Sequence, residues 1–357
     1  MIIYPPNIFT DDNFINYTAI VNFLNTDEDL FFKIDNKYAD WVTTKSDPLL
    51  IALLIPAMKA NEDIKVHGKI SKKLYNNLDN IQDLLIKVIP VLSKINVDAE
   101  LIEESKQPYK NVLTGFSAGV DAFTTFDDYY LNTKYDIKIT HFLFNNLTYG
   151  KGRIQQKIEN IETIKNKYQI PLFQTWSNLH RFYKKGHKIG FEQTHTMRNA
   201  AIPHFLGGTP NLFLYSSTFH KELNNPVVSK DIAIIDDLLL PLLSSNSVTC
   251  MSVGSEYTRL DKTIKISKLD DAYNHLDICI GKQTRKFINC GTCRKCTRAL
   301  LTFELLNQQH NFKNVFNLEE WHKIRLEYIQ ELKNRTQLND NELYNYIVNN
   351  YKELLAE

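Results

Sequence analysis

A small-residue segment that follows an apolar run could bind an anion. Residues 111–116 predict a buried strand, Ser117–Gly119 a tight turn, and residues 121–132 a helix. Small side chains let successive backbone N–H groups converge on a phosphate, and the helix adds the positive end of its dipole. The alternative is an ordinary strand-to-helix turn in which Asp121 caps the helix. The Walker spacing Gly-x-x-x-x-Gly-Lys-Ser/Thr does not occur in the sequence, so a phosphate site here would be of another kind.

Four of the five cysteines have the spacing of a metal site: Cys279, Cys290, Cys293 and Cys296. Two residues between cysteines allow a tight turn to place both sulfurs on one tetrahedral zinc ion, and this spacing occurs twice here. The alternatives are a redox-active Cys-x-x-Cys pair or reduced thiols that bind nothing. Cys250 lies in an apolar run, and we expect it in the core. Nearby cations would offset the negative charge of a four-thiolate zinc site: Arg285, Lys286, Arg294, Lys295 and Arg298.

The composition is that of a soluble globular protein. The 357 residues are 43% hydrophobic and 23% charged, which is ordinary for one large or two smaller domains. A net charge of +1 argues against a protein that grips nucleic-acid backbone. The first residues do not resemble a signal peptide, and no apolar run is long enough to span a bilayer. Cysteines arranged for metal fit a reducing compartment, so we expect a cytoplasmic protein that does not bind membranes.

The chain divides into three expected regions. Residues 1–108 predict an N-terminal α/β domain for substrate or partner recognition, with a polar linker at 103–108. Residues 109–305 alternate between predicted strands and helices, which indicates a doubly wound, mostly parallel sheet. Residues 306–357 predict a helical C-terminal extension. The expected strands are 30–34, 64–67, 97–101, 112–116, 137–144, 172–176, 212–216 and 248–253. The expected helices are 48–58, a helix capped by Ser71, 121–132, 153–168, 195–206, 231–243, 298–308, 318–334 and 340–355.

Residues 110–305 resemble a known family of nucleotide-binding enzymes. The segment with Ser117, Gly119 and Asp121 is similar to the Ser-Gly-Gly-x-Asp-Ser loop of the PP-loop (N-type) ATP pyrophosphatases. The order of this loop, the predicted sheet and the cysteine cluster resembles the 7-cyano-7-deazaguanine synthase branch. Further matching segments are Tyr149-Gly150-Lys151, Arg198-Asn199, Asp261-Lys262, and Arg298 after the last cysteine.

The resemblance implies an adenine nucleotide alpha hydrolase-like fold and an ATP-dependent ligase or synthase. ATP and Mg²⁺ would bind at Phe116, Ser117, Ala118, Gly119, Val120, Asp121, Tyr149 and Ser216. Asp121 would hold Mg²⁺, while Arg198 and Lys262 would stabilise the departing pyrophosphate. The cysteines would hold a structural Zn²⁺. The implied reaction adenylates a carboxylate, of a small molecule or a peptide or protein terminus, and then forms a carbon–nitrogen bond, in a specialised biosynthetic or defence pathway.

Two departures from the family pattern leave an alternative open. Ala118 replaces a glycine, and Ala122 replaces the serine whose hydroxyl family members direct at a phosphate. The protein could therefore be a non-catalytic nucleotide-binding zinc scaffold, and a third reading, RNA thiolation, is disfavoured by the neutral charge. Arg198 and Lys262 could also be ordinary surface charges. The histidines of this region, His195, His204 and His220, are expected to be structural. The deazaguanine substrate cannot be carried over, and a homodimer is left open.

Overall fold

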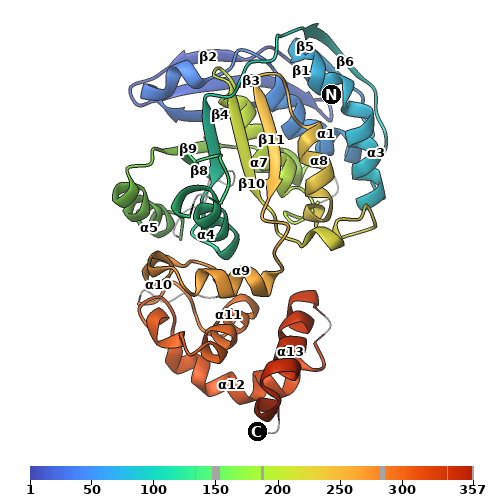
Figure 1. Ribbon diagram of the computed structural model, residues 1–357. Coiled ribbons are helices and arrows are strands. Elements are labelled where there is room, and N and C mark those ends of the chain that lie inside the picture. The colour runs from blue at the N-terminus through green and yellow to red at the C-terminus, as the bar shows by residue number, and fades with distance from the viewer. Residues whose placement is uncertain (133, 147–152, 186–188, 282–285, 336, 356–357) are drawn as a thin grey trace. The chain divides into compact units, whose positions relative to one another are not determined.

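The computed structural model of the protein describes residues 1–132, 134–146, 153–185, 189–281, 286–335 and 337–355. The chain forms two compact units (Figure 1). Unit 1 contains residues 1–115, 135–155 and 169–255. Unit 2 contains residues 116–134, 156–168 and 256–357. No helix in the described ranges is long and apolar enough to cross a bilayer.

Unit 1 is built on one mixed sheet, in which the described residues form eleven strands. The order along the sheet is β11-β10-β7-β8-β9-β4-β3-β1-β5-β6, and β2 pairs with β3. The bounds are β1 (Ile2–Ile3), β2 (Asn7–Thr10), β3 (Phe14–Phe23), β4 (Thr26–Asp35), β5 (Ile64–Ser71), β6 (Val97–Ile102), β7 (Asn111–Gly115), β8 (His141–Asn146), β9 (Leu172–Ser177), β10 (Asn211–Ser216) and β11 (Val248–Val253).

The half of the sheet from β11 to β9 is entirely parallel. Its strand order reverses at β7, because the chain adds β8 and β9 on one side of β7 and β10 and β11 on the other. In open parallel sheets, ligands bind beyond the carboxyl ends of the strands at such a reversal. The predicted α/β class with a mostly parallel sheet is confirmed.

The N-terminal strands extend this same sheet. The division of the chain therefore differs from the one expected from the sequence, which placed domain boundaries at 108/109 and 305/306. The edge of β9 pairs with β4 in antiparallel register, with Phe32 opposite Ser177 and Ile34 opposite Thr175. An antiparallel hairpin of two ten-residue strands, β3 and β4, follows, and β5 and β6 lie beyond β1. Because backbone hydrogen bonds run across from β9 to β4, residues 1–108 do not form a unit of their own.

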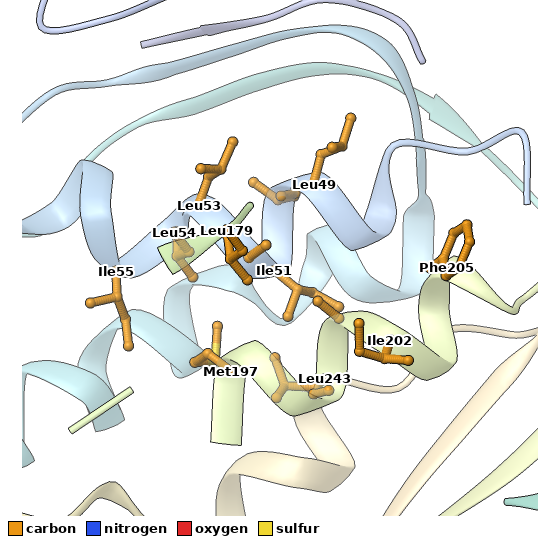
Figure 2. Packing of buried hydrophobic residues seen from close by; sticks show 14 of the residues in the cluster. Leu49, Ile51, Leu53, Leu54, Ile55, Leu179, Met197, Ile202, Phe205 and Leu243 are labelled. Carbon is orange, nitrogen blue, oxygen red and sulfur yellow. The ribbon is translucent and has the colours of Figure 1, made fainter. Parts of the chain in front are cut away.

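Helices α1 (Asp47–Ala60) and α7 (His195–Phe205) pack against each other in the core of unit 1 (Figure 2). Pro48 in the first turn favours the start of α1, and Asn61 ends it in a left-handed conformation. Residues 47–58 of α1 are all buried, as expected for a helix that other elements surround. The remaining helical segments of unit 1 are η1 (Asn36–Trp41), α2 (Lys72–Asn76), α3 (Leu78–Val88), α6 (His180–Lys184), η3 (Lys221–Leu223), η4 (Ile232–Ile235) and α8 (Asp236–Leu242).

Unit 2 is helical. Its segments are α4 (Val120–Phe126), the π-helical turn η2 (Asp127–Leu131), most of α5 (Arg153–Tyr168), α9 (Arg259–Ile266), α10 (Asp270–His275), α11 (Arg294–Leu305), η5 (Gln309–Phe312), α12 (Leu318–Leu332), α13 (Leu338–Asn350) and η6 (Lys352–Leu355). Its core includes the stacked rings of Phe303 and Phe312, 3.9 Å apart, and the fully buried Trp321. The expected C-terminal extension is therefore part of the unit that holds the cysteines.

Candidate functional site

The four cysteines of the predicted metal site come together in unit 2. The sulfurs of Cys279, Cys290, Cys293 and Cys296 all lie within 4.8 Å of one another. The Cys293–Cys296 sulfur distance is 3.4 Å, and the Cys290–Cys296 and Cys279–Cys293 distances are 4.0 Å. Sulfurs bound to one zinc ion at about 2.3 Å in a tetrahedron lie roughly 3.8 Å apart. The cluster could therefore hold a metal ion such as zinc.

The backbone around the cysteines is fixed by a buried asparagine. The Asn289 carboxamide oxygen accepts the N–H groups of Ile278 and Cys279, at 3.0 and 3.2 Å, and its amide nitrogen donates to two carbonyls. Gly281 leaves room for the sulfurs, because a Cβ there would lie 2.9 Å from the Cys290 sulfur. Gly291 has a φ of +82°, and a side chain would overlap the carbonyl of Asn317.

Two backbone N–H groups donate hydrogen bonds to sulfurs of the cluster. The Cys290 sulfur accepts the backbone N–H of Cys293 at 3.3 Å, and the Cys279 sulfur accepts that of Cys290 at 3.5 Å. Hydrogen bonds among the thiols lower the pKa of Cys293, raise the pKa of Cys279 to about 11, and raise the pKa of Cys296 well above its usual value. Among the expected cations, Lys286, Arg294 and Lys295 are exposed, Arg298 pairs with Asp340 at 3.5 Å, and Arg285 lies outside the described residues.

Cys250 belongs to the core of unit 1, which confirms the expectation. It is 2% exposed, and its sulfur lies 3.9 Å from Nε2 of His204. Burial raises the pKa of Cys250 to about 12 and lowers that of His204 to about 3. A neutral thiol beside a neutral imidazole is not a nucleophilic pair, because the nucleophile is the thiolate.

The small-residue loop forms a tight turn at the start of α4. Ala118 adopts a left-handed φ of +56°, and its carbonyl accepts the Asp277 N–H at 2.8 Å. Ser117 is exposed, whereas Phe116 and Val120 are buried. Phe116 packs edge-on against other aromatic rings of unit 2. Of the side chains at 116–120, that of Ser117 is thus the best placed for a ligand, and the others could contribute through backbone groups.

Asp121 sits between two cations on the first turn of α9. Its carboxylate lies 2.8 Å from Nη2 of Arg259 and 3.2 Å from Nζ of Lys262, whose side chain is 1% exposed. Burial alone would raise the pKa of Asp121, but the charges of Arg259 and Lys262 outweigh it and lower that pKa. Burial lowers the pKa of Lys262, and Asp121 opposes that effect. The structure thus brings together two predicted residues, Asp121 and Lys262.

Sequence reasoning missed Arg259. Positions three apart on a helix share a face, so a basic residue three positions before Lys262 could have indicated this contact. It also missed Asp127 and Asp128, both buried, which pair with Lys265 at 2.7 and 2.9 Å. Nothing in the local sequence marks these two acids as buried.

The Thr124 hydroxyl does not stand in for the missing serine at position 122. Ala122 is buried, and α4 begins at Val120. Thr124 donates its hydroxyl proton to the carbonyl of Val120 at 2.9 Å, as a helix-interior threonine often does. The phosphate contact that Ala122 lacks is therefore not replaced by Thr124.

The other predicted nucleotide and pyrophosphate contacts lie elsewhere in the chain. Arg198 and Ser216 belong to unit 1, on α7 and at the end of β10, and Tyr149 lies outside the described residues. The Arg198 guanidinium carbon lies 3.9 Å from the ring centroid of Tyr183 and 5.6 Å from that of Phe191. Arg198 is 6% exposed, so it is not an ordinary surface charge.

A series of hydrogen-bonded side chains includes His195 in unit 1. Nε2 of His195 lies 3.0 Å from Asp231, and Nδ1 lies 2.8 Å from the hydroxyl of Tyr215. Tyr215 accepts from Asn199 at 3.4 Å, and Asn199 accepts from Asn145 at 3.2 Å. No sequence signal could have shown this series of hydrogen bonds, because the residues that form it are up to 86 positions apart. It satisfies His195 fully, in agreement with a structural histidine.

A buried acid lies against α7, and a histidine caps η3. Thr196 donates to Asp236 at 2.7 Å, and burial raises the pKa of Asp236 to about 7. Nδ1 of His220 accepts the N–H of Glu222 at 3.4 Å and so caps η3.

Comparison of the chain with protein-family models, with curated proteins and with solved structures finds no match.

Proposed function

We propose that the protein binds ATP with Mg²⁺ at Ser117–Asp121 and adenylates a carboxylate, releasing pyrophosphate before a carbon–nitrogen bond forms. The observation that supports this most is the meeting of Asp121 with Arg259 and Lys262 directly after the small-residue loop. The strand order of the parallel half-sheet, which reverses at β7, also supports an adenine nucleotide alpha hydrolase-like fold.

The charges around Asp121 suit a triphosphate. Two cations against one carboxylate leave a net charge of +1, and the lowered pKa keeps Asp121 ionised at neutral pH. Mg²⁺ prefers one or two carboxylates together with phosphate oxygens and water, so Asp121 fits it as a ligand. The ion would neutralise the β- and γ-phosphates when bound. Arg259 and Lys262 lie beside Asp121, so their charges would offset the negative charge of the phosphate oxygens.

The proposed reaction needs positioned charges rather than a nucleophilic side chain. A carboxylate oxygen of the substrate attacks the α-phosphorus, and the bond from that phosphorus to the bridging oxygen breaks. Lys262 and Arg259 stabilise the negative charge that collects on pyrophosphate as it leaves. An amine then attacks the acyl carbon, AMP departs, and the nitrogen loses a proton. The carboxylate would come from a small molecule or from a peptide or protein terminus.

We also propose that the four cysteines bind structural zinc. Four cysteine sulfurs would fill all four coordination positions of a tetrahedral zinc ion and leave none for water. This is the arrangement of a structural zinc site rather than a catalytic one. Cys296 lies in the first turn of α11 and Cys279 follows α10, so the ion would hold these two helices together.

A second candidate function is a nucleotide-binding zinc scaffold that does not turn ATP over. Ala122 and the internally bonded Thr124 favour it, because a phosphate contact of the family loop is missing and not replaced by Thr124. Loss of one hydrogen bond to a buried charged acceptor costs about 1–3 kcal/mol.

One incubation separates the two functions. The full chain is mixed with Mg²⁺, ATP labelled at the α-phosphate, and a panel of small carboxylates and peptides. AMP with pyrophosphate supports the ligase, whereas nucleotide binding without products supports the scaffold. Asp121→Asn should weaken Mg²⁺-dependent ATP binding. Asp261→Asn is the matched control, because it removes the same charge from a residue in the capping box of α9. Equal ATP binding by wild type and Asp121→Asn would contradict both functions at this loop.

A further inference from the structure

Arg198 is a buried cation without an acidic partner in the described part of the chain. The residue is 6% exposed, and its Nε makes no hydrogen bond to any described group. The undescribed positions cannot readily supply an acid, because Glu357 is the one aspartate or glutamate among them. Burying a charge without a counterion costs several kcal/mol in proteins, so an unpaired guanidinium needs an explanation.

The groups around Arg198 attract the guanidinium but leave at least its Nε without an acceptor. Tyr183 and Phe191 present their rings to the guanidinium, at 3.9 and 5.6 Å from the centroids. An aromatic face stabilises a cation, but it does not replace the oxygen acceptors that the five N–H groups prefer. Tyr183 is 3% exposed and its hydroxyl donates to the carbonyl of Ala52, whereas Phe191 is 56% exposed. The apolar ring of Phe191 is therefore the part of this environment that faces solvent.

The helical turn that carries Arg198 is held in place from both sides. His195 and Asn199, three positions before and one after it, both hydrogen-bond the hydroxyl of Tyr215, at 2.8 and 3.4 Å. The backbone is thus fixed while the guanidinium keeps donors for another molecule. A preorganised donor of this kind binds with a small loss of conformational entropy.

We propose that Arg198 binds the carboxylate of a ligand with an apolar body. The planar guanidinium matches the two oxygens of a carboxylate, and one unpaired positive charge balances one negative charge. Asp231 and Asp236 bond His195 and Thr196 on the same helix, so more negative charge than one carboxylate carries is unfavourable here. This disfavours pyrophosphate, the contact that the family resemblance implies for Arg198. The inference goes beyond the adenylation reaction and does not depend on ATP.

The test measures thermal unfolding of the full chain in sodium benzoate, with sodium chloride and sodium pyrophosphate at equal ionic strength for comparison. Benzoate should raise the unfolding midpoint of the wild type and of Arg181→Met, a control at an exposed arginine of unit 1. Arg198→Met should remove the benzoate effect and, in chloride, unfold at the wild-type temperature or above, because the uncompensated charge is gone. Arg198→Lys keeps the charge without the planar fork and should need about tenfold more benzoate.

Four results would overturn the proposal. Benzoate could leave the wild type unchanged, or it could stabilise Arg198→Met as much as the wild type. Stabilisation by pyrophosphate but not by benzoate would instead favour the pyrophosphate contact. If Arg198→Met does not fold, or unfolds well below the wild type in chloride, the guanidinium is structural. Because ATP and Mg²⁺ are absent from these measurements, a negative result would leave the proposed adenylation untested and intact.

Discussion

Replacing Asp121 by asparagine should destabilise unit 2 as well as weaken ATP binding. The side chain keeps its shape but loses the charge that faces Arg259 and Lys262, at 2.8 and 3.2 Å. Breaking a fully buried ion pair costs about 3–5 kcal/mol. The Asp121 side chain is 27% exposed, so solvent weakens the interaction, and we expect a loss of about 2 kcal/mol at pH 7.

Acid should remove the difference in unfolding free energy between wild type and Asp121→Asn. The pKa of Asp121 is lowered in the folded state from its ordinary value of 3.8. A lowered pKa means that the carboxylate stabilises the fold fully above the ordinary value and loses that effect as the pH falls through the folded value. The gap in unfolding free energy between wild type and Asp121→Asn should therefore be constant from pH 7 to about pH 5 and should shrink below about pH 4.

The measurement can be confined to unit 2. Of the three tryptophans, Trp321 alone belongs to unit 2, and it is fully buried, whereas Trp41 and Trp176 belong to unit 1. Urea unfolding of a Trp41→Phe, Trp176→Phe background, followed by tryptophan fluorescence, reports on Trp321. Lys262→Met and the double variant complete a mutant cycle, and we expect a coupling energy of about 1–2 kcal/mol.

The control is Asp261→Asn, which should change stability by less than about 0.5 kcal/mol, because the asparagine side-chain oxygen can still accept the Thr258 N–H in the capping box of α9. A coupling energy near zero, or a loss in Asp121→Asn no larger than in this control, would refute the reasoning. The ion pair would then contribute no measurable stability, as is true of many ion pairs at protein surfaces.

Three further predictions concern the metal and the chemistry. Cys293→Ala should reduce zinc from about one equivalent to less than half by elemental analysis and lower the unfolding midpoint of unit 2, since structural zinc contributes directly to folding; wild-type protein purified without chelator that lacks zinc would contradict this. Lys262→Ala should slow pyrophosphate release about a hundredfold with little change in ATP affinity, because its interaction strengthens as charge develops; equal losses in both would indicate simple binding. Ala122→Ser should speed an impaired but working site by about tenfold and leave a scaffold silent, as judged by the same release assay.

Local signals in the sequence were reliable where the structure depends on neighbouring residues. The start of α1 at Asp47-Pro48 and the clustering of the four cysteines follow from short spacings that fix geometry over a few residues. The alternation of strands and helices after residue 110 likewise predicted the parallel half of the sheet. These features need no knowledge of distant partners.

The antiparallel part of unit 1 was missed for two physical reasons. The β3–β4 hairpin turns at Leu24 and Asn25, whose φ angles of 53° and 57° are of the kind that Asn-Gly or Gly-Gly turns usually supply. A leucine there gives no turn signal. The pairing of β4 with β9 joins residues about 140 positions apart, and no periodicity within either strand reveals its neighbour. The expected boundary at residue 108 followed from that missing contact.

Charge balance distinguishes the two proposed sites from ordinary ion pairs. Lys265 with Asp127 and Asp128 in unit 2 has more acid than base, and it has no reason to attract an anion. Asp121 with Arg259 and Lys262 has one positive charge in excess. Arg198 in unit 1 has one positive charge and no acidic partner among the described residues. A fold selected for stability alone would lose little by replacing such excess buried charge with apolar side chains. Excess positive charge beside small or apolar groups is therefore better explained by anionic ligands, a triphosphate in unit 2 and a carboxylate in unit 1.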